Sequence, residues 1–263
     1  MELGVTGKRA FVSGSTQGIG YAIAKALLEE GAAVVVNGRA DGRVRSAVES
    51  LARDVPGAAV SGLAADFEDP EQVRGLLASL GEVDILVNNV GLFDVAPFGD
   101  VDDAEWQRYF GVNVMSGVRL SRHLLPAMLA NGWGRILFIG SESGVNIPAD
   151  MVHYGVTKAA MLALGNGLAK LTRGTEVTVN TILGGPTYSD GVAGTVERIA
   201  EAQAMEAEQL KAAIIGGNST TLLERFLEPQ EIAHLAVYLA SPLSSATNGA
   251  ALRADGGVLT TMT

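Results

Sequence analysis

The stretch Ser13-Gly14-Ser15-Thr16-Gln17-Gly18-Ile19-Gly20 decides how this chain is expected to fold. A strand-like apolar run, Arg9–Ser13, leads into it. After it, apolar residues recur at helical spacing: Ile19, Ala22, Ile23, Ala26 and Leu27. A glycine-rich turn between a strand and a helix presents free backbone N–H groups and the positive helix end to a pyrophosphate. Glycine clusters also form ordinary tight turns, so this position between two elements carries the prediction of dinucleotide binding.

Short apolar runs alternate with longer helical patterns along the rest of the chain. The runs expected to form strands are Arg9–Ser13, Ala33–Asn37, Ala59–Ala64, Asp84–Asn88, Gly134–Gly140, Val177–Ile182 and Ala250–Ala254. Several are apolar at consecutive positions, as strands covered on both faces are. The alternation predicts right-handed crossovers and therefore an α/β fold: a Rossmann-type, doubly wound parallel β-sheet flanked by helices, in a single domain over residues 1–263.

Composition excludes several classes of protein. With 48% hydrophobic residues the chain is not expected to be disordered, and no apolar run approaches the roughly 20 residues of a membrane span. The first residues lack a secretory pattern and there is no cysteine, which favours a cytoplasmic protein without a cysteine-based metal site. The net charge of −10 argues against nucleic acid or an anionic membrane as partner. No metal is expected, since the acidic stretch Asp66–Glu71 lacks metal-ligand spacing.

Beyond this pattern, the chain resembles the short-chain dehydrogenase/reductase family. Gly14, Gly18 and Gly20 match that family's Gly-x-x-x-Gly-x-Gly turn. The resemblance continues in family order at Asp66, at Asn88-Asn89-Val90-Gly91 and at Asp255-Gly256-Gly257, with Val90 for the family's alanine, and it covers nearly the whole chain. It implies the following cofactor contacts: Gly14, Ser15, Thr16, Gln17, Gly18, Ile19, Gly20, Arg39, Asp66, Phe67, Asn89, Gly91, Tyr154, Lys158, Gly185 and Thr187.

The tip of the second predicted strand bears on which nicotinamide cofactor is used. Relatives that prefer NAD typically carry an acidic residue there, whereas this chain has Gly38 followed by Arg39. An acidic side chain would repel the 2′-phosphate of NADP, and a guanidinium forms charge-assisted hydrogen bonds with it. We therefore expect NADP in preference to NAD. The alternative is that Arg39 is a solvated surface residue beside Asp41.

The segment Tyr154-Gly155-Val156-Thr157-Lys158 has the family's Tyr-x-x-x-Lys spacing. Residues four apart share a helix face, so a phenol and an ammonium can flank one ligand. Proton exchange near neutrality needs a phenol pKa well below its usual value of about 10. A cation about 4 Å away would lower that pKa by roughly three units, with the oxidised nicotinamide ring assisting against desolvation. The spacing occurs by chance in many helices, and its place in the family order makes it specific.

Two further residues complete the catalytic set that the resemblance implies. Ser141 matches the serine whose hydroxyl holds and polarises the substrate oxygen, and Ser143 is the neighbour with which it could be confused. Asn113 matches an asparagine that supports a water chain to the lysine, and a buried amide satisfying helix backbone is the plainer interpretation. His153 does not share a helix face with the adjacent Tyr154, so we expect it to serve packing or the pocket rim.

A long polar and helical insertion at residues 187–228 follows the sixth predicted strand. It predicts one or two helices of a substrate lid, and a surface elaboration is the alternative. Gly184, where the family has proline, is expected to loosen the start of this segment. The expected substrate contacts are Phe93, Ser143, Met151 and Tyr188. The largely apolar wall around them favours a bulky, weakly polar ketone or alcohol.

Together these residues predict hydride transfer between NADP(H) and a ketone or secondary alcohol, by a carbonyl reductase or alcohol dehydrogenase. A 3-oxoacyl-carrier-protein reductase ranks second, because Gly132 and Thr175 stand where several such enzymes offer basic residues to an acidic carrier. A protein of another class, a non-catalytic nicotinamide-binding sensor, would not need the full set of Ser, Tyr, Lys and Asn.

Two long predicted helices, Asp103–Leu129 and Val152–Thr172, lead to an expected quaternary structure. The family commonly pairs these helices across a two-fold axis, which implies a homotetramer or a homodimer. Small residues at Ala159, Ala160, Ala163 and Gly167 would allow a close approach between subunits. The alternative is that these small residues face the subunit's own sheet.

Overall fold

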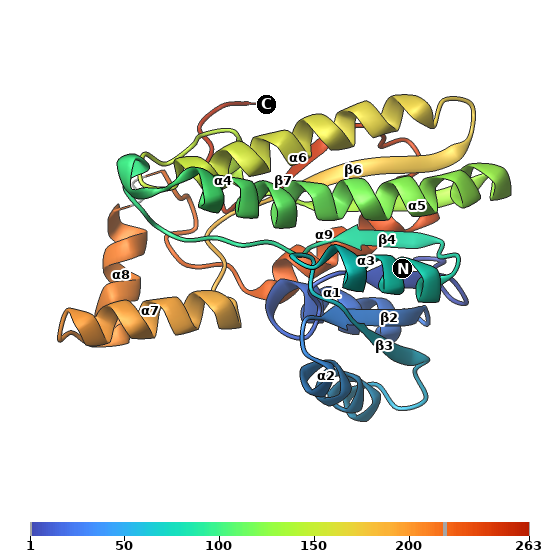
Figure 1. Ribbon diagram of the computed structural model, residues 1–263, viewed down its shortest axis with the longest axis horizontal. Coiled ribbons are helices and arrows are strands. Elements are labelled where there is room, and N and C mark those ends of the chain that lie inside the picture. The colour runs from blue at the N-terminus through green and yellow to red at the C-terminus, as the bar shows by residue number, and fades with distance from the viewer. Residues whose placement is uncertain (1, 218–219, 263) are drawn as a thin grey trace.

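A seven-stranded parallel sheet forms the centre of the computed structural model, which describes residues 2–217 and 220–262 (Figure 1). The strands are β1 (Arg9–Val12), β2 (Ala33–Gly38), β3 (Val60–Ala64), β4 (Ile85–Asn88), β5 (Trp133–Ile139), β6 (Glu176–Gly184) and β7 (Ala251–Ala254). Their spatial order is β3-β2-β1-β4-β5-β6-β7, so the order reverses between β1 and β4. The predicted doubly wound sheet is confirmed, and this reversal places a ligand crevice at the carboxyl ends of β1 and β4.

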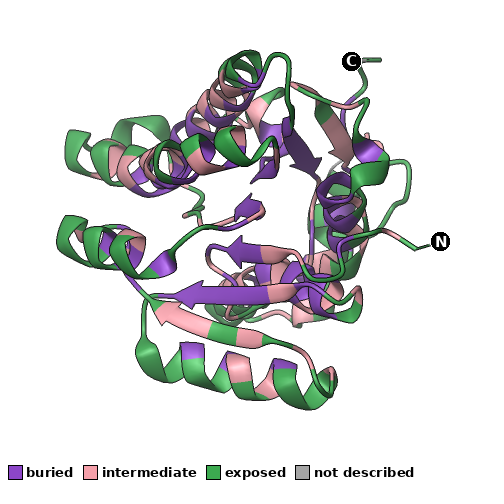
Figure 2. Cartoon of the chain, turned by 90° about the vertical axis from the view of Figure 1, so that its right-hand side faces the viewer, coloured by how far each residue is buried: buried purple, intermediate pink, exposed green. Residues whose placement is uncertain are grey.

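Helices cover both faces of the sheet. One face carries α1 (Gly18–Glu29), α2 (Asp41–Asp54) and α9 (Pro229–Ala240), and the other carries α3 (Pro70–Leu80), α5 (Met115–Asn131) and α6 (Val152–Leu171). Figure 2 shows the buried residues concentrated in the strands and on the helix surfaces turned toward them. This arrangement explains why the strand sequences are apolar at consecutive positions.

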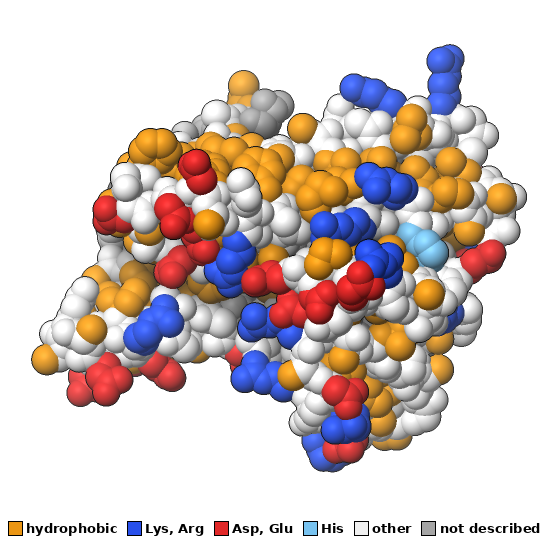
Figure 3. Space-filling model, in the orientation of Figure 1, with side chains coloured by type: hydrophobic (Ala, Val, Ile, Leu, Met, Phe, Trp, Pro, Cys, Tyr) orange, Lys and Arg blue, Asp and Glu red, His pale blue; other side chains and the backbone are white. Residues whose placement is uncertain are grey.

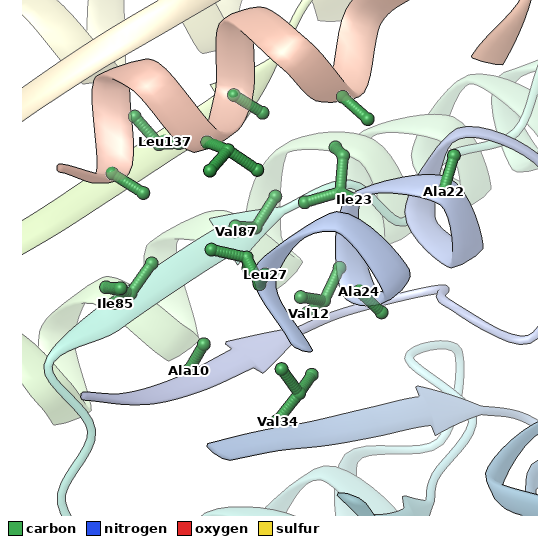
Figure 4. Close-up of a cluster of buried hydrophobic side chains, with 14 of the residues drawn as sticks. Ala10, Val12, Ala22, Ile23, Ala24, Leu27, Val34, Ile85, Val87 and Leu137 are labelled. Carbon is green, nitrogen blue, oxygen red and sulfur yellow. The ribbon is translucent and has the colours of Figure 1, made fainter. Parts of the chain in front are cut away.

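The alternation of side chains along the central strands builds two cores. Ala10 and Val12 of β1 belong to the cluster under α1 and α9, drawn in Figure 4, whereas Phe11 between them belongs to the cluster on the opposite face. In β4, Val87 and Leu86 divide in the same way. Burying a Val, Leu or Phe side chain stabilises the fold by about 1.5–3 kcal/mol. The two clusters therefore hold the strands, and the sheet edge at which the strands end, in place.

The predicted helix Asp103–Leu129 is interrupted, which corrects the sequence-based expectation. The structure has α4 (Asp103–Tyr109), a π-helical turn over Phe110–Val114, and then α5. A π turn adds a residue to the helical repeat and occurs frequently at functional sites. Asn113 lies in this turn and is fully buried, so the irregular backbone aims its amide inward. The apolar spacing of the segment did not reveal the break.

The insertion after β6 forms a separate pair of helices. The two helices are α7 (Asp190–Ala202) and α8 (Ala207–Gly217), which stand off one end of the sheet in Figure 1. Val196, Ala200 and Leu210 pack them against each other in a small cluster of their own. Gly184 pairs in register with Ala254, so β6 continues through the position that was expected to loosen. Positions 218 and 219 of the predicted lid lie outside the described residues.

Within the described residues, no helix combines the length and the apolar character that crossing a membrane requires. The same residues contain no group of three or more His, Cys, Asp or Glu side chains placed to hold a metal ion.

Candidate functional site

A cleft of about 700 Å³ lies at the carboxyl edge of the sheet. Its walls are the glycine-rich turn, the tip of β2, the loop after β4, the start of α7 and two residues of α6, Tyr154 and Lys158. In Figure 3 the surface is hollowed between the α7–α8 pair and the rest of the molecule, with charged side chains along the rim. The volume is within the usual range for small-molecule and cofactor sites.

Asparagine side chains hold the glycine-rich turn in shape. Asn37 at the end of β2 accepts a hydrogen bond from the Gly14 N–H at 3.1 Å. Asn89, after β4, donates from Nδ2 to the carbonyls of Ser13 at 3.0 Å and Gly14 at 2.8 Å. Its own backbone N–H donates to the Ser13 hydroxyl at 2.9 Å. Residues at the ends of three neighbouring strands, β2, β1 and β4, therefore preorganise one turn, and Asn89 acts through the turn's backbone.

The glycines of the turn are required by its geometry. Gly14 and Gly18 adopt φ values of +61° and +59°, which side chains rarely allow. A Cβ on Gly20 would lie 2.4 Å from the Gly14 carbonyl oxygen, so α1 and the turn touch there. Gly14, Thr16, Gln17, Gly18 and Ile19 line the cleft. Ser15 and Gly20 are buried behind it, where the Ser15 hydroxyl donates to the Val12 carbonyl at 2.6 Å. The cradle suits the phosphates of a dinucleotide.

The far end of the cleft is basic. Arg39 and Arg43 both line it, and neither has an ion-pair partner in the part of the chain that the structure describes. Asp41 is instead paired with Arg45. A Cβ on Gly38 would lie 2.5 Å from Thr16 Cγ2, so the turn itself occupies the space where an acidic side chain would begin. Arg43 was missed in the sequence, although its spacing of four from Arg39 could have indicated it.

Asp66 and Phe67 follow β3 and also belong to the cleft wall. Both line the cleft, Asp66 half-buried and Phe67 with its ring buried in the core. The Asp66 carboxylate accepts from the Glu68 N–H at 3.0 Å, which shapes the turn before α3. Asp69 then caps that helix by accepting from the N–H groups of its first turn. The acidic stretch thus forms the start of α3, and Asp66 remains at the cleft wall.

The proposed catalytic residues converge at the floor of the cleft. Ser141 lies close enough to Tyr154 for its side chain to lower the pKa of the phenol. The Ser141 oxygen also accepts from the Ser143 N–H at 3.1 Å, so Ser143 supports Ser141 and is itself buried. Lys158 Nζ donates to the Ile139 carbonyl at 2.8 Å and lies 5.6 Å from the centre of the Tyr154 ring. The two hydroxyls are placed to hold one oxygen atom of a ligand between them.

We expected Lys158 to lower the phenol pKa, with the oxidised nicotinamide ring assisting against desolvation, and desolvation is the largest influence on that pKa in the structure. Desolvation raises the pKa of Tyr154 to about 12, against a smaller lowering by the side chain of Ser141. Desolvation also lowers the pKa of Lys158 to about 8. Burial therefore dominates the phenol pKa, and Lys158 is not among the groups that shift it. Bringing the phenol pKa below its usual value of about 10 therefore requires more stabilisation of the phenolate than Ser141 provides.

Asn113 connects the π turn to both walls of the cleft. Its Oδ1 accepts from the Leu92 N–H at 2.7 Å, and its Nδ2 donates to the Thr157 hydroxyl at 2.9 Å. A Cβ on Gly91 would lie 3.5 Å from Asn113 Oδ1 and 3.7 Å from Lys158 Nζ. The amide is thus fully used in fixing the loop after β4 against α6, at the side of the lysine.

Phe93, at 41% exposure, lines the cleft, whereas several other predicted site residues lie outside its lining. Met151 is the half-buried residue before α6. Gly185 packs against the Asp255 backbone, and Thr187 is buried. Tyr188 stacks edge-on with Phe226, 5.5 Å between ring centres, in a second cavity beneath α8. His153 is buried against Tyr109, with ring centres 4.4 Å apart, as a packing residue.

The start of α7 contributes two residues that the sequence reading overlooked. Ser189 lines the cleft and caps α7 by accepting from the Val192 N–H at 3.4 Å. Asp190 accepts a hydrogen bond from the Gly18 N–H at 2.6 Å. Ser189 and Asp190 together are a helix-start signal in the sequence. The contact of Asp190 with the distant glycine-rich turn cannot be recognised from the residues around it.

Known proteins share this architecture. The family model described as enoyl-(acyl carrier protein) reductase matches residues 14–259. The chain is 44% identical over 263 residues to the uncharacterized oxidoreductase YvrD of Bacillus subtilis, which covers 98% of this chain and 99% of that protein. It is 32% identical over 257 residues to a D-beta-hydroxybutyrate dehydrogenase of Cupriavidus necator, covering 96% and 98% of the two chains.

Among solved structures, the chain is similar to the L-sorbose reductase of Gluconobacter frateurii in complex with NADPH and L-sorbose. The two superpose with a TM-score of 0.93 at 32% sequence identity, and the match covers 100% of both chains. The likeness therefore extends over the sheet, the cleft and the α7–α8 pair together.

Proposed function

Because the chain belongs to the short-chain dehydrogenase/reductase family, we propose that it is an NADP(H)-dependent carbonyl reductase or alcohol dehydrogenase. One observation carries the proposal. The side chain of Ser141 lies close enough to Tyr154 to lower its phenol pKa, and Lys158 on the same helix places its Nζ 5.6 Å from the centre of the Tyr154 ring. Such a pair can grip one carbonyl or alcohol oxygen.

The residues divide the work as follows. The nicotinamide, when bound, supplies or accepts the hydride. Ser141 holds the substrate oxygen, and the Tyr154 hydroxyl donates its proton to that oxygen as a ketone becomes an alcohol. In the reverse direction the deprotonated phenol takes the proton back. Lys158, whose pKa burial lowers to about 8, provides a nearby cation that stabilises the phenolate.

Asn113 is a positioning residue in this proposal. It holds the Leu92 backbone and the Thr157 hydroxyl at once, and Thr157 in turn donates to the Tyr154 carbonyl at 2.7 Å. This chain of hydrogen bonds fixes the first turn of α6, on which Tyr154 stands. A catalytic phenol needs such support, because small displacements of reacting groups reduce rates strongly.

NADP(H) is the cofactor that the cleft fits. Arg39 and Arg43 offer two guanidinium groups, without ion-pair partners among the described residues, at the end where the adenosine ribose of a dinucleotide would lie. Thr16 fills the space beside Gly38 in which the carboxylate of an NAD-preferring relative would stand. The presence of NADPH in the similar L-sorbose reductase supports the same assignment.

A weakly polar ketone or secondary alcohol is the substrate class we favour. Exposed apolar side chains stand on the two loops that follow β4 and β5, and the first of them lines the cleft: Phe93, Val95, Val145 and Ile147. The second cavity beside the lid contains Lys211 and Arg225, and each is paired, with Glu208 and Glu231. Neither cation is left to receive an acidic carrier protein, so an acyl-carrier substrate ranks second.

The test is a turnover assay with a panel of ketones, in which the decrease in NADPH absorbance reports the rate. We expect reduction of bulky aliphatic or aromatic ketones with NADPH, a much slower reaction with NADH, and weak activity toward short keto acids. Consumption of NADPH that does not depend on any ketone or aldehyde would contradict the proposal.

Two further parts of the proposal concern the whole molecule. The α7–α8 pair, within residues 187–228, serves as the substrate lid of a single catalytic domain located in the cytoplasm. The subunits assemble as a homotetramer, or a homodimer, through α5 and α6. Ala163 and Gly167 support this, because both are exposed on α6 and nothing lies within 4 Å of a Cβ placed on Gly167. Light scattering that shows a fully active monomer would contradict the assembly.

A further inference from the structure

The first residue of α7 reaches across the cleft to the glycine-rich turn. The Asp190 carboxylate accepts a hydrogen bond from the Gly18 N–H, with 2.6 Å between Oδ2 and N. The two residues are 172 positions apart in sequence, and the contact is exposed. Gly18 is the first residue of α1 and lines the cleft. A side chain of the insertion is therefore bound to the part of the turn that faces the ligand.

This contact places a negative charge at the positive end of α1. The preceding residue, Gln17, makes no capping hydrogen bond with its side chain, and the first turn of α1 contains no acidic residue. Asp190 therefore supplies the carboxylate at a helix end where backbone N–H groups and the helix dipole favour an anion. The described residues provide no Lys or Arg ion-pair partner for Asp190, so its charge is compensated there by the turn.

The neighbours of Asp190 also rest on the walls of the cleft. Ser189 Cβ would lie 3.2 Å from a Cβ on Gly18, and the ring of Phe93 lies 3.6 Å from a Cβ on Gly191. The first turn of α7 thus bridges the glycine-rich turn and the loop after β4. When Asp190 moves, the start of the insertion must move with it.

We infer that Asp190 is an internal anion that competes with the cofactor pyrophosphate for the Gly18 N–H. The bond between them, here called the Asp190 latch, holds the start of α7 on the turn until a dinucleotide binds. The arriving pyrophosphate places like charge at the same helix end, breaks the latch and frees the lid. The inference rests on the cofactor placement of the proposed function. It makes cofactor binding a precondition for lid movement and lowers the affinity for NADPH.

The test compares Asp190→Asn with Glu197→Gln by fluorescence titration. Asparagine can still accept from the Gly18 N–H, so the variant removes the charge and keeps the shape. Glu197 is an exposed acid on the same helix, away from the cleft lining, and its substitution changes the net charge equally. The probes are NADPH and adenosine 2′-monophosphate, which has the 2′-phosphate but no pyrophosphate.

We expect Asp190→Asn to bind NADPH about threefold to tenfold more tightly than wild type, the size of a charge effect at a helix end. Glu197→Gln should bind NADPH as wild type does, and all three proteins should bind the monophosphate equally. An unchanged or weaker affinity of Asp190→Asn for NADPH overturns the latch. So does an equal gain for both probes, which would indicate an altered turn.

Hydrogen–deuterium exchange at residues 190–202 provides a second readout on the lid itself. The latch predicts that NADPH accelerates exchange at the start of α7 in wild type, and that the monophosphate does not. In Asp190→Asn the exchange should be fast before any ligand is added. Slower exchange in the NADPH-bound wild type overturns the latch alone. A wild-type protein that binds no NADPH overturns the proposed function as well.

Discussion

The carboxyl edge of the sheet and the α7–α8 pair are built in opposite ways. At the edge, Asn37 and Asn89 tie three strands to one turn, and two large clusters lie beneath them. The helix pair has a cluster of its own around Val196 and a single charged contact with the turn. Groups that transfer protons and hold phosphates therefore stand on a framework with many redundant constraints. The segment next to the substrate region has few buried contacts, as segments that open locally do.

This difference assigns separate duties to the two regions. Precise placement of reacting groups requires rotamers fixed by packing and supporting hydrogen bonds, which the sheet edge provides. Admission of a bulky substrate requires a segment that can move without disturbing that edge. Substitutions at the edge should therefore change the chemical step or cofactor affinity, and substitutions in the helix pair should change mainly KM.

The largest expected effect is on turnover in Tyr154→Phe. Removing the hydroxyl eliminates the proton donor, so kcat should fall about 10²- to 10⁴-fold, the usual contribution of a general acid or base. The Kd for NADPH should stay within twofold of wild type, because the phenyl ring remains. Steady-state kinetics together with a fluorescence titration measure both. Near-normal kcat in this variant would place the proton transfer elsewhere.

The buried lysine should reduce stability, and Lys158→Met should reveal it. With a folded pKa near 8 against a usual value of 10.5, the native state holds fewer protons than the unfolded state between these values. Wild-type stability should therefore rise with pH across that interval. At pH 7 the methionine variant should be more stable by about 1–3 kcal/mol, and the difference should shrink toward pH 10.

Urea unfolding at several pH values measures this prediction. The matched control is Lys25→Met, because Lys25 is a half-exposed lysine in a surface ion pair with Asp54 at 3.4 Å. Its effect should stay below about 1 kcal/mol at every pH. A stability gap for Lys158→Met that does not narrow with rising pH would show that the buried charge is not its cause.

At the basic end of the cleft, Arg39→Ala should weaken NADPH binding by about tenfold or more, since charge-assisted bonds to phosphate are lost. Arg43→Ala should have a smaller effect in the same direction. Binding of NADH should hardly change in either variant. Arg45→Ala is the matched control, because that guanidinium is paired with Asp41. Parallel losses for NADPH and NADH would refute a 2′-phosphate site.

The smallest effect should come from the helix pair. Val196 is 2% exposed in the cluster between α7 and α8, so Val196→Ala loosens the lid without touching the sheet edge. We expect KM for the ketone to rise about threefold, with little change in the rate of hydride transfer in a single turnover. Gly194→Ala is the control, since an added Cβ there meets nothing within 4 Å. A slower hydride step at unchanged KM would place chemistry in the lid.

Much of this arrangement could be predicted from sequence because its signals are local. The turn around Gly14 and the consecutive apolar residues of β1 and β4 lie within short windows that report directly on fold. The π turn at Asn113 could not be predicted in that way, because its amide is aimed by contacts with Leu92 and Thr157.

The missed features share a common cause, which is contact between residues far apart in the chain. The space beside Gly38 is filled by Thr16, from the end of another strand, and the Gly18 N–H is met by Asp190. The extent to which desolvation raises the phenol pKa could not be predicted from spacing either, because the burial of Tyr154 depends on the whole surrounding fold. Sequence spacing indicates which side chains can lie close together, whereas their burial in the fold determines their pKa values.

The central claim is tested most directly by following the hydride itself. NADPH carrying deuterium at the nicotinamide C4 is incubated with the enzyme and a ketone it reduces, and the product is examined by NMR. The account predicts one deuterium on the carbinol carbon of the secondary alcohol, with product formation lost in Tyr154→Phe. Two results would contradict it. One is alcohol that carries no deuterium, whichever C4 face of the cofactor is labelled, and the other is equal product formation by Tyr154→Phe.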